Sequence, residues 1–200
     1  MVRTIAKDHE EKRHAILKTA AKFFAKNGYD RSSMSQLAIE CGVSKALIYH
    51  YYDSKEALLY DIIYTHLNDL VDAVNAAKPS DDPEQHLRNL VHAILTQYRD
   101  ADAEHKLQLD ATNALPKSNQ ETLADLQRQL VVTLSNAIKE TSPASFDDKP
   151  ENLRPVTMSM FGMLNWFYLW YRRGKGITRQ DYADLATDLL LGGIKEIGQK

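Results

Sequence analysis

Apolar residues recur at steps of three and four residues along nearly the whole chain, and no segment shows the alternation of a half-buried strand. One such stripe contains Ile16, Ala20, Phe23 and Phe24. A longer one contains Leu59, Ile63, Leu67, Leu70 and Val74. Apolar residues make up 44% of the 200-residue chain, which is enough for a packed core. The sequence therefore predicts an all-α fold.

Start and stop signals place the ends of these helices. Two residue pairs have the spacing of a capping box, Ser33 with Gln36 and Asp53 with Glu56. Ser44 offers a further capping hydroxyl. The predicted helices cover residues 10–27, 33–41, 45–52, 56–78, 83–102, 104–115, 119–141, 153–173 and 179–198. The segment TSPASFDDKPEN, residues 141–152, is rich in turn-forming residues and predicts an exposed loop.

Two short predicted helices, 33–41 and 45–52, are joined by a turn of about four residues that contains Gly42. This is the pattern of a helix-turn-helix, whose second helix can lie in the DNA major groove. Ile48 and Tyr52 are four residues apart on that helix, so we expect them to pack inward with Val43.

The remaining side chains of the second helix form the expected reading surface. Ala46 and Leu47 suit base edges and thymine methyl groups, and His50 can donate to a base or a phosphate. Phosphate contacts are expected from Lys45, Tyr49, Tyr51 and Lys55. The amide groups at the start of the helix that Ser33 caps can bind another phosphate.

The charge distribution agrees with such a site. Residues 1–55 contain ten Lys and Arg against six Asp and Glu, whereas the remaining residues contain fifteen against twenty-one. A basic segment in a slightly acidic chain suits a polyanion, because phosphate attraction depends on nearby charge. A solvated charged face is the alternative interpretation of the charge taken alone.

The sequence lacks the motifs that would indicate an enzyme. It contains no GxGxxG, no GxxxxGK[ST] and no HExxH. His9 and His14 in HEEKRH are five residues apart, so they lie on different faces of a helix and cannot share a zinc ion. We therefore expect no catalytic residues, no cofactor and no metal site.

The expected compartment is the cytoplasm. The chain has no run of about 18 apolar residues, and its charged first residues do not suit a signal-peptide core. We expect no membrane association. Cys41 is the single cysteine, which excludes an internal disulfide and favours a reducing compartment.

The stretch from Arg13 to Leu59, and especially GYDRSSMSQLAIECGVSKALIYHYYDSKEALL, resembles the DNA-binding domain of the TetR family of transcriptional repressors. The resemblance implies a homodimer of all-helical subunits with a DNA-binding domain at residues 1–55. Residues 56–200 would bind an effector, and the last two helices would form the dimer. By the same matching, double-stranded operator DNA would contact Ser33, Ser44, Lys45, Ala46, Leu47, Tyr49, His50, Tyr51 and Lys55.

The chain departs from the family pattern within this stretch. Many members have Gly and a small polar residue where Ala46 and Leu47 stand, and Phe where Tyr52 stands. A direct polar contact between residue 47 and a base is therefore not expected.

Two later segments, Met160 to Gly193 and Tyr98 to Leu109, are similar to TetR-family regulators of phenylacetate and related acyl-CoA catabolism. This narrower resemblance implies an acyl-CoA effector such as phenylacetyl-CoA. The acyl part would need an apolar cavity, and the phosphates would need cations. The candidates for the cavity are His92, Tyr98, Asn113, Asn165, Trp166 and Tyr168, and those for the phosphates are Arg172, Arg173 and Lys175.

The resulting hypothesis is a repressor that a small molecule releases from DNA. Two alternatives on the same scaffold stay open, an activator and a ligand-sequestering protein. The sequence does not distinguish repression from activation, because that depends on where the operator lies relative to the promoter.

Overall fold

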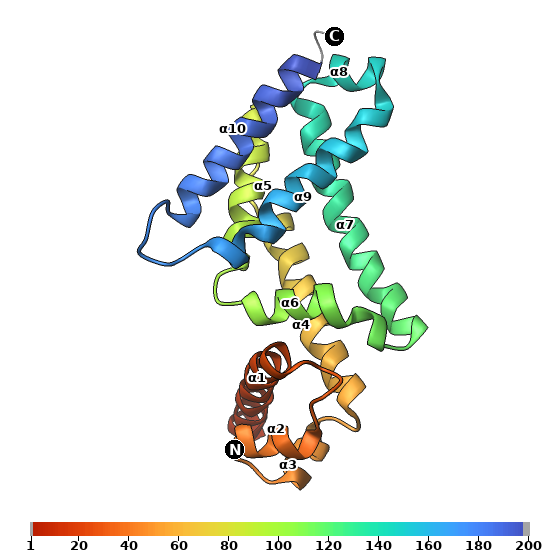
Figure 1. Ribbon diagram of the computed structural model, residues 1–200, viewed down its shortest axis with the longest axis vertical. Coiled ribbons are helices and arrows are strands. Elements are labelled where there is room, and N and C mark those ends of the chain that lie inside the picture. Colours follow the sequence, from red (N-terminus) through yellow and green to blue (C-terminus); the bar gives the residue numbers. More distant parts are fainter. Residues whose placement is uncertain (1, 198–200) are drawn as a thin grey trace. The chain divides into compact units, whose positions relative to one another are not determined.

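The structure, a computed structural model, describes residues 2–197 and the side chains of residues 9–197. The described residues form helices and no strand, apart from an isolated β-bridge between Arg172 and Lys175. This confirms the all-α prediction. The helices are α1 (Val2–Asn27), α2 (Met34–Glu40), α3 (Lys45–Tyr51), α4 (Lys55–Asn75), α5 (Pro83–Gln97), α6 (Asp102–Ala111), η1 (Thr112–Ala114), α7 (Lys117–Thr141), α8 (Pro143–Asp148), η2 (Pro150–Asn152), α9 (Leu153–Trp170) and α10 (Arg179–Ile197) (Figure 1).

These elements form two compact units. Unit 1 contains Met1–Leu67 and Asp100–Ala124, and unit 2 contains Asn68–Arg99 and Asp125–Lys200. Helices α4 and α7 contribute residues to both units. These units reflect how the chain packs. The expected division into a DNA-binding domain, residues 1–55, and an effector-binding domain, residues 56–200, is a division by function, and it stays a prediction.

The helix-turn-helix is formed by the predicted caps. Ser33 Oγ accepts a hydrogen bond from Gln36 N at 3.2 Å, and the Gln36 side chain accepts one from Ser33 N at 3.0 Å. Gly42 follows α2 with a φ of 66°, in the left-handed region that favours glycine. Ser44 Oγ then accepts from Leu47 N at 3.1 Å, which starts α3.

The cap of α4 corrects one prediction. Ser54 Oγ, and not the Asp53 side chain, accepts the capping bond, from Ala57 N at 3.0 Å. A capping side chain reaches the amide of the second or third helical residue, and α4 begins at Lys55, so Ser54 occupies the capping position. The predicted pair Asp53 and Glu56 was wrong by one residue.

Two other predictions were wrong because of local structure that the pattern did not show. The predicted helix 83–102 ends at Gln97, and Asp100 has a φ of 60°, which a continuing right-handed helix does not allow. Residues 143–148 and 150–152, within the segment predicted as an exposed loop, form α8 and η2, although most of these residues are exposed as expected. Phe146 in α8 is 1% exposed, and burial of this aromatic side chain outweighs the surrounding turn-forming residues.

The helix predicted over 153–173 ends at Trp170, because Tyr171 is extended with a ψ of 137°. Gly174 and Gly176, each with a φ of 76°, shape the loop that follows. The predicted end of the last helix at Gly198 lies outside the described residues.

Unit 1 is built on the buried face of α1. Ala20, Ala21 and Phe24 are completely buried, and α1 packs against α2 and α6. An ion pair of 2.9 Å between Lys18 Nζ and Glu104 Oε1 also joins α1 to α6. The helix-turn-helix and α6 therefore belong to one packed unit.

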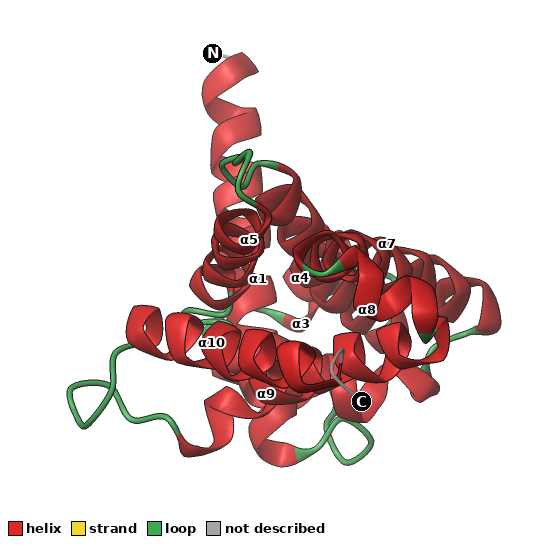
Figure 2. Cartoon of the chain, turned by 90° about the horizontal axis from the view of Figure 1, so that it is seen from above, coloured by secondary structure: helices red, strands yellow, loops and turns green. Residues whose placement is uncertain are grey.

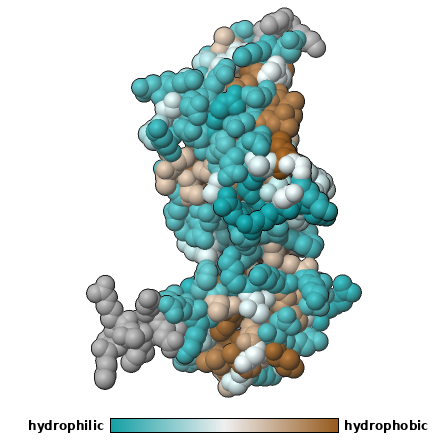
Figure 3. All heavy atoms as spheres, turned by 90° about the vertical axis from the view of Figure 1, so that its left-hand side faces the viewer, coloured by the Kyte–Doolittle hydropathy of each residue, from teal (hydrophilic) through white to brown (hydrophobic). Residues whose placement is uncertain are grey.

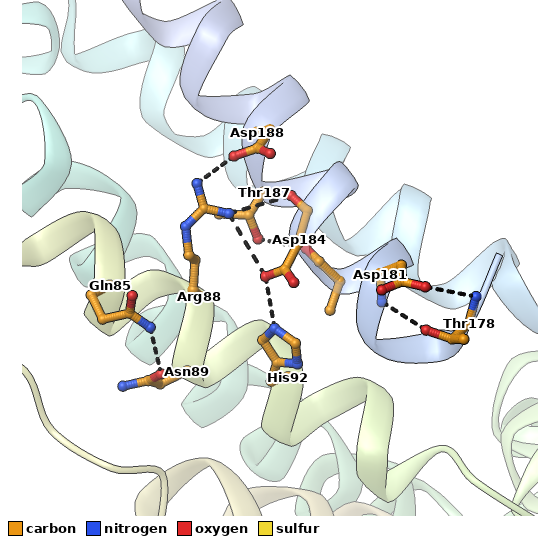
Figure 4. A network of polar contacts seen from close by, with 10 residues as sticks. Gln85, Arg88, Asn89, His92, Thr178, Asp181, Asp184, Thr187 and Asp188 are labelled. Atoms are coloured by element: carbon orange, nitrogen blue, oxygen red, sulfur yellow. Dashed lines mark hydrogen bonds and ion pairs between the residues drawn. The ribbon is translucent and has the colours of Figure 1, made fainter.

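Unit 2 is organised around α10, which packs against α5 and α9 (Figure 2). Polar contacts reinforce the packing of α5 on α10, as Figure 4 shows: Arg88 pairs with Asp188, and His92 Nε2 lies 2.8 Å from Asp184 Oδ1. None of the helices in the described part of the chain has the length and apolarity needed to span a bilayer.

Candidate nucleic-acid interface

Helix α3 buries one face and exposes the other. Ile48 is completely buried and Tyr52 is 6% exposed, and Val43 is half-buried beside them. This burial confirms the predicted inward face. Lys45, Ala46, Tyr49 and His50 are exposed, while Leu47 and Tyr51 are half-buried. The outward face therefore has the predicted composition, and its contact with DNA stays a prediction.

A carboxylate on α4 holds the C-terminal end of α3. Asp61 Oδ2 accepts a hydrogen bond from the Tyr52 hydroxyl at 2.6 Å. Arg13 Nη2 of α1 donates to both Asp61 oxygens, at 2.8 and 2.6 Å. Burial, and after it the bond to Asp61, raises the pKa of Tyr52, so the phenol stays protonated as a donor.

Sequence analysis missed Arg13 and Asp61 as parts of this site. They are 48 residues apart in the chain, and only packing brings them together. The sequence offered one signal for this network. Tyr52 stands where many family members have Phe, and its additional hydroxyl needs a hydrogen-bond partner when it is buried. The Tyr52–Asp61–Arg13 network positions α3 through its buried end and leaves the exposed face free.

Lys55 has a different role from the predicted one in this structure. Its Nζ donates to Tyr29 O and to Ser32 O, both at 3.1 Å, and lies 4.2 Å from the centre of the Tyr29 ring. The ammonium group therefore holds the turn that precedes α2. A lysine has three donors, so one remains for the predicted phosphate contact.

His9, which the sequence analysis considered only as a zinc ligand, is a further candidate for the nucleic-acid interface. Its ring centre lies 4.6 Å from that of Tyr51 and 6.2 Å from that of His50. Lys45 Nζ lies 5.5 Å from the centre of the Tyr49 ring on the same helix. The exposed surface of α3 thus joins basic and aromatic side chains, which are groups that bind phosphates and base edges.

The predicted effector residues do not all come together. Within unit 2, the Tyr98 hydroxyl donates to Asn165 Oδ1 at 2.8 Å, and Tyr98 is only 7% exposed, a burial that raises its pKa. His92 instead belongs to the surface network with Asp184 in Figure 4. Tyr168 is half-buried on α9.

Two other predicted cavity residues have different surroundings, and their part in effector binding stays a prediction. Trp166 is 61% exposed, because it lies on the outer face of α9. Asn113 belongs to unit 1, where it lines a separate cavity beside α6. Arg172, Arg173 and Lys175 are exposed in the loop between α9 and α10, so they remain accessible to a phosphate.

Helices α9 and α10 carry an exposed apolar face. The large apolar residues on this face are Met158, Trp166, Leu169, Trp170, Leu185 and Leu189. Figure 3 shows part of this surface as the brown patch in the upper half of the molecule. A groove of about 250 Å³ between α9 and α10, lined by Met163, Leu189 and Gly193, continues this face. We name the six exposed apolar residues, together with the groove that continues them, the α9–α10 face.

Comparison with known proteins covers both parts of the chain. Residues 16–62 match the family model described as "Bacterial regulatory proteins, tetR family", and residues 80–194 match "Tetracyclin repressor-like, C-terminal domain". A crystal structure of a TetR-family transcriptional regulator from Bordetella parapertussis is 30% identical, with a TM-score of 0.84 and coverage of 90% of this chain and 93% of that chain.

Two further proteins are informative. AibR, solved in complex with isovaleryl coenzyme A and operator DNA, is 24% identical with a TM-score of 0.75, and the match covers 90% of this chain and 98% of that chain. The transcriptional activator FasR of Mycolicibacterium smegmatis is 33% identical over 42% of this chain and 39% of its own length. The matches to the first curated relatives span only 19%, 32% and 39% of those proteins.

Proposed function

Because this chain belongs to the TetR family of bacterial transcriptional regulators, we propose that it is a repressor that binds a palindromic operator as a homodimer. We further propose that an acyl-CoA releases the protein from this operator. The observation that supports DNA binding is the exposed face of α3. Buried Ile48 and the Tyr52–Asp61–Arg13 network fix the opposite side of this helix to the rest of unit 1. That arrangement fixes the helix and presents Lys45, Tyr49 and His50 outward.

The homodimer is proposed from the α9–α10 face. Leu189 is 60% exposed there, and exposed apolar patches of this kind mark sites of protein association. Gly162, Gly192 and Gly193 are exposed on the same two helices, and an added Cβ at any of them would meet no atom within 4 Å. A second copy packed on this face would pair two α3 helices for half-sites about 34–36 Å apart.

The proposed effector is a CoA thioester such as phenylacetyl-CoA. AibR, which has the same fold, is bound to isovaleryl coenzyme A in its crystal structure. In unit 2 of this chain, the buried Tyr98–Asn165 pair offers polar groups to the acyl part, and Arg172, Arg173 and Lys175 offer cations to the phosphates. Release requires the effector to bind more tightly to the state that does not bind DNA. To shift the ratio of that state to the DNA-binding state from 1:99 to 99:1, the effector must bind it about 10⁴-fold more tightly.

The experiment is a gel-shift titration of the purified protein on the intergenic DNA upstream of its own gene, with and without phenylacetyl-CoA. We expect binding to that DNA and its loss at saturating phenylacetyl-CoA, with free CoA and phenylacetate as controls. Full binding at saturating thioester would exclude this effector, and equal binding to unrelated DNA would exclude an operator there.

The reading face can be tested with four variants of α3. Lys45→Ala and Tyr49→Ala should weaken binding to every sequence, because phosphate contacts carry no sequence information. Leu47→Ala and His50→Ala should change the preference between operator and mutated operator. Equal losses in all four variants on all sequences would show that the assigned face is wrong.

An activator is the second candidate, and the similarity to FasR supports it, because FasR is named a transcriptional activator. Deletion of the gene distinguishes the two roles. Transcripts of neighbouring genes should rise on deletion if the protein is a repressor, and should fall if it is an activator.

A further inference from the structure

Unit 1 contains a cavity of about 410 Å³ whose lining residues all belong to this unit. It opens between the end of α1 with its following turn on one side and α6 with η1 on the other. Its volume is within the range of about 300–1,000 Å³ that is typical of small-molecule sites. The buried side chains of Phe24, Leu107 and Ala111 supply its apolar part.

The polar groups of the cavity differ in whether they are already paired. Lys106 and Asp110 form an ion pair with each other, so their charges largely cancel. Asp30 is exposed and makes no hydrogen bond or ion pair within the described part of the chain. Arg31 lies outside the lining, with its Nη2 near Gly28, and is exposed to solvent. The carboxylate of Asp30 is therefore the uncompensated charge of the lining.

Tyr29 supplies a second indication. The residue is 8% exposed, and its hydroxyl is buried without a hydrogen-bond partner among the residues that the structure describes. Burial raises the pKa of this hydroxyl, and the carboxylates of Glu56 and Asp30 raise it further. Lys55 Nζ lies over the face of the Tyr29 ring and donates to the backbone oxygens of Tyr29 and Ser32. The charged residues of the lining are two carboxylates, Asp30 and Asp110, against one ammonium, Lys106, and this balance favours a positively charged ligand.

From these features we propose that the cavity binds a small organic amine, with its ammonium group at Asp30 and its apolar body against Phe24 and Leu107. The amide of Asn113, which also lines the cavity, can bond a polar substituent of the amine. This site does not depend on the proposed effector, because it uses residues of unit 1 alone. A ligand there would join α1 to α6 and so stabilise the unit that carries α3.

The test is isothermal titration calorimetry on the full-length protein with three probes of similar shape. Tryptamine carries an ammonium group, tryptophol a neutral hydroxyl and indole-3-acetate a carboxylate. We expect tryptamine to bind about tenfold more tightly than tryptophol, because hydrogen bonds to charged groups are the stronger ones. Indole-3-acetate should bind most weakly.

Three variants locate the binding. Asp30→Asn should remove the preference for tryptamine over tryptophol, and it changes an exposed residue that the fold does not need. Ala114→Trp should abolish binding of both, because it fills the cavity from its exposed rim. Asp53→Asn is the matched control, since Asp53 is an exposed carboxylate of unit 1 outside the cavity.

The proposal is overturned if tryptophol binds as tightly as tryptamine, or if none of the probes binds at millimolar concentration. It is also overturned if Asp30→Asn keeps the preference while Asp53→Asn removes it. Unchanged DNA binding in Asp30→Asn separates this result from the fate of the proposed repressor function.

Discussion

Asp61 is the residue on which the position of α3 depends most directly. It accepts from the Tyr52 hydroxyl and from Arg13 at once, and its side chain is only 19% exposed. Removal of either donor would leave part of a nearly buried charge without a partner, which is costly. The exposed residues of α3 contribute little to folding in comparison, so they are free to vary with the operator.

We predict that Tyr52→Phe destabilises the protein by about 1 kcal/mol, because it removes one hydrogen bond to a carboxylate. Operator affinity should fall several-fold in parallel, since α3 loses its fixed end. Urea unfolding and the gel shift measure the two effects. Tyr64→Phe is the matched control, because Tyr64 is a 36% exposed tyrosine on α4, the helix that carries Asp61. Equal stability of Tyr52→Phe and the unchanged protein would contradict this role of the network.

A second residue prediction concerns His66, which is buried in unit 1 with its ring centre 5.7 Å from that of His105. Burial, then the neighbouring His105 and Lys18, lowers the pKa of His66 to about 3. The unfolded chain therefore binds a proton below about pH 6.5 that the folded chain does not, so stability falls as the pH falls. We expect a loss of about 2 kcal/mol between pH 8 and pH 5 from this group.

His66→Leu should remove that part of the pH dependence, whereas His14→Gln should not, because His14 is exposed. Urea unfolding at a series of pH values measures both. An identical pH slope for His66→Leu and the unchanged protein would show that His66 is not the group responsible.

Among the helices, α4 has the most informative start. Its cap is Ser54, although Asp53 with Glu56 has the more obvious spacing in the sequence. Tyr52, which precedes Asp53, donates a hydrogen bond to Asp61 of α4. A side chain within α4 itself thus holds the chain just before that helix starts.

Ser54→Ala should destabilise the protein by about 1 kcal/mol, the usual cost of losing a capping hydroxyl. Asp53→Ala should cost clearly less, since its side chain does not make the capping bond. Thermal unfolding followed by circular dichroism compares the two variants. The reverse order of stabilities would restore Asp53 as the cap.

For the whole molecule, the α9–α10 face is the feature that a single chain leaves unexplained. Leu185 and Leu189 are exposed on α10, and Trp166 and Trp170 on α9. Apolar area of this kind is stable in water when another surface covers it. A homodimer satisfies that need and also supplies the second α3 helix that a palindromic operator requires.

We predict that Leu189→Arg converts the proposed dimer to monomers, because an arginine would be buried without a partner in the proposed interface. Val132→Arg is the control, since Val132 is a 50% exposed apolar residue on α7, outside this face. Sedimentation velocity measures the mass of both variants. An unchanged mass for Leu189→Arg would place the interface elsewhere.

Periodicity and capping residues were sufficient to predict the all-α fold, the two caps of the helix-turn-helix and the inward face of α3. These features depend on residues within four positions of one another, and for that reason they are visible in the chain order. The bonds of Asp61 to Tyr52 and Arg13, the burial of Phe146 and the place of Asn113 in unit 1 were not predictable. Each of these depends on side chains that only packing brings together, and the energy of such contacts is set by distance in space and not along the sequence.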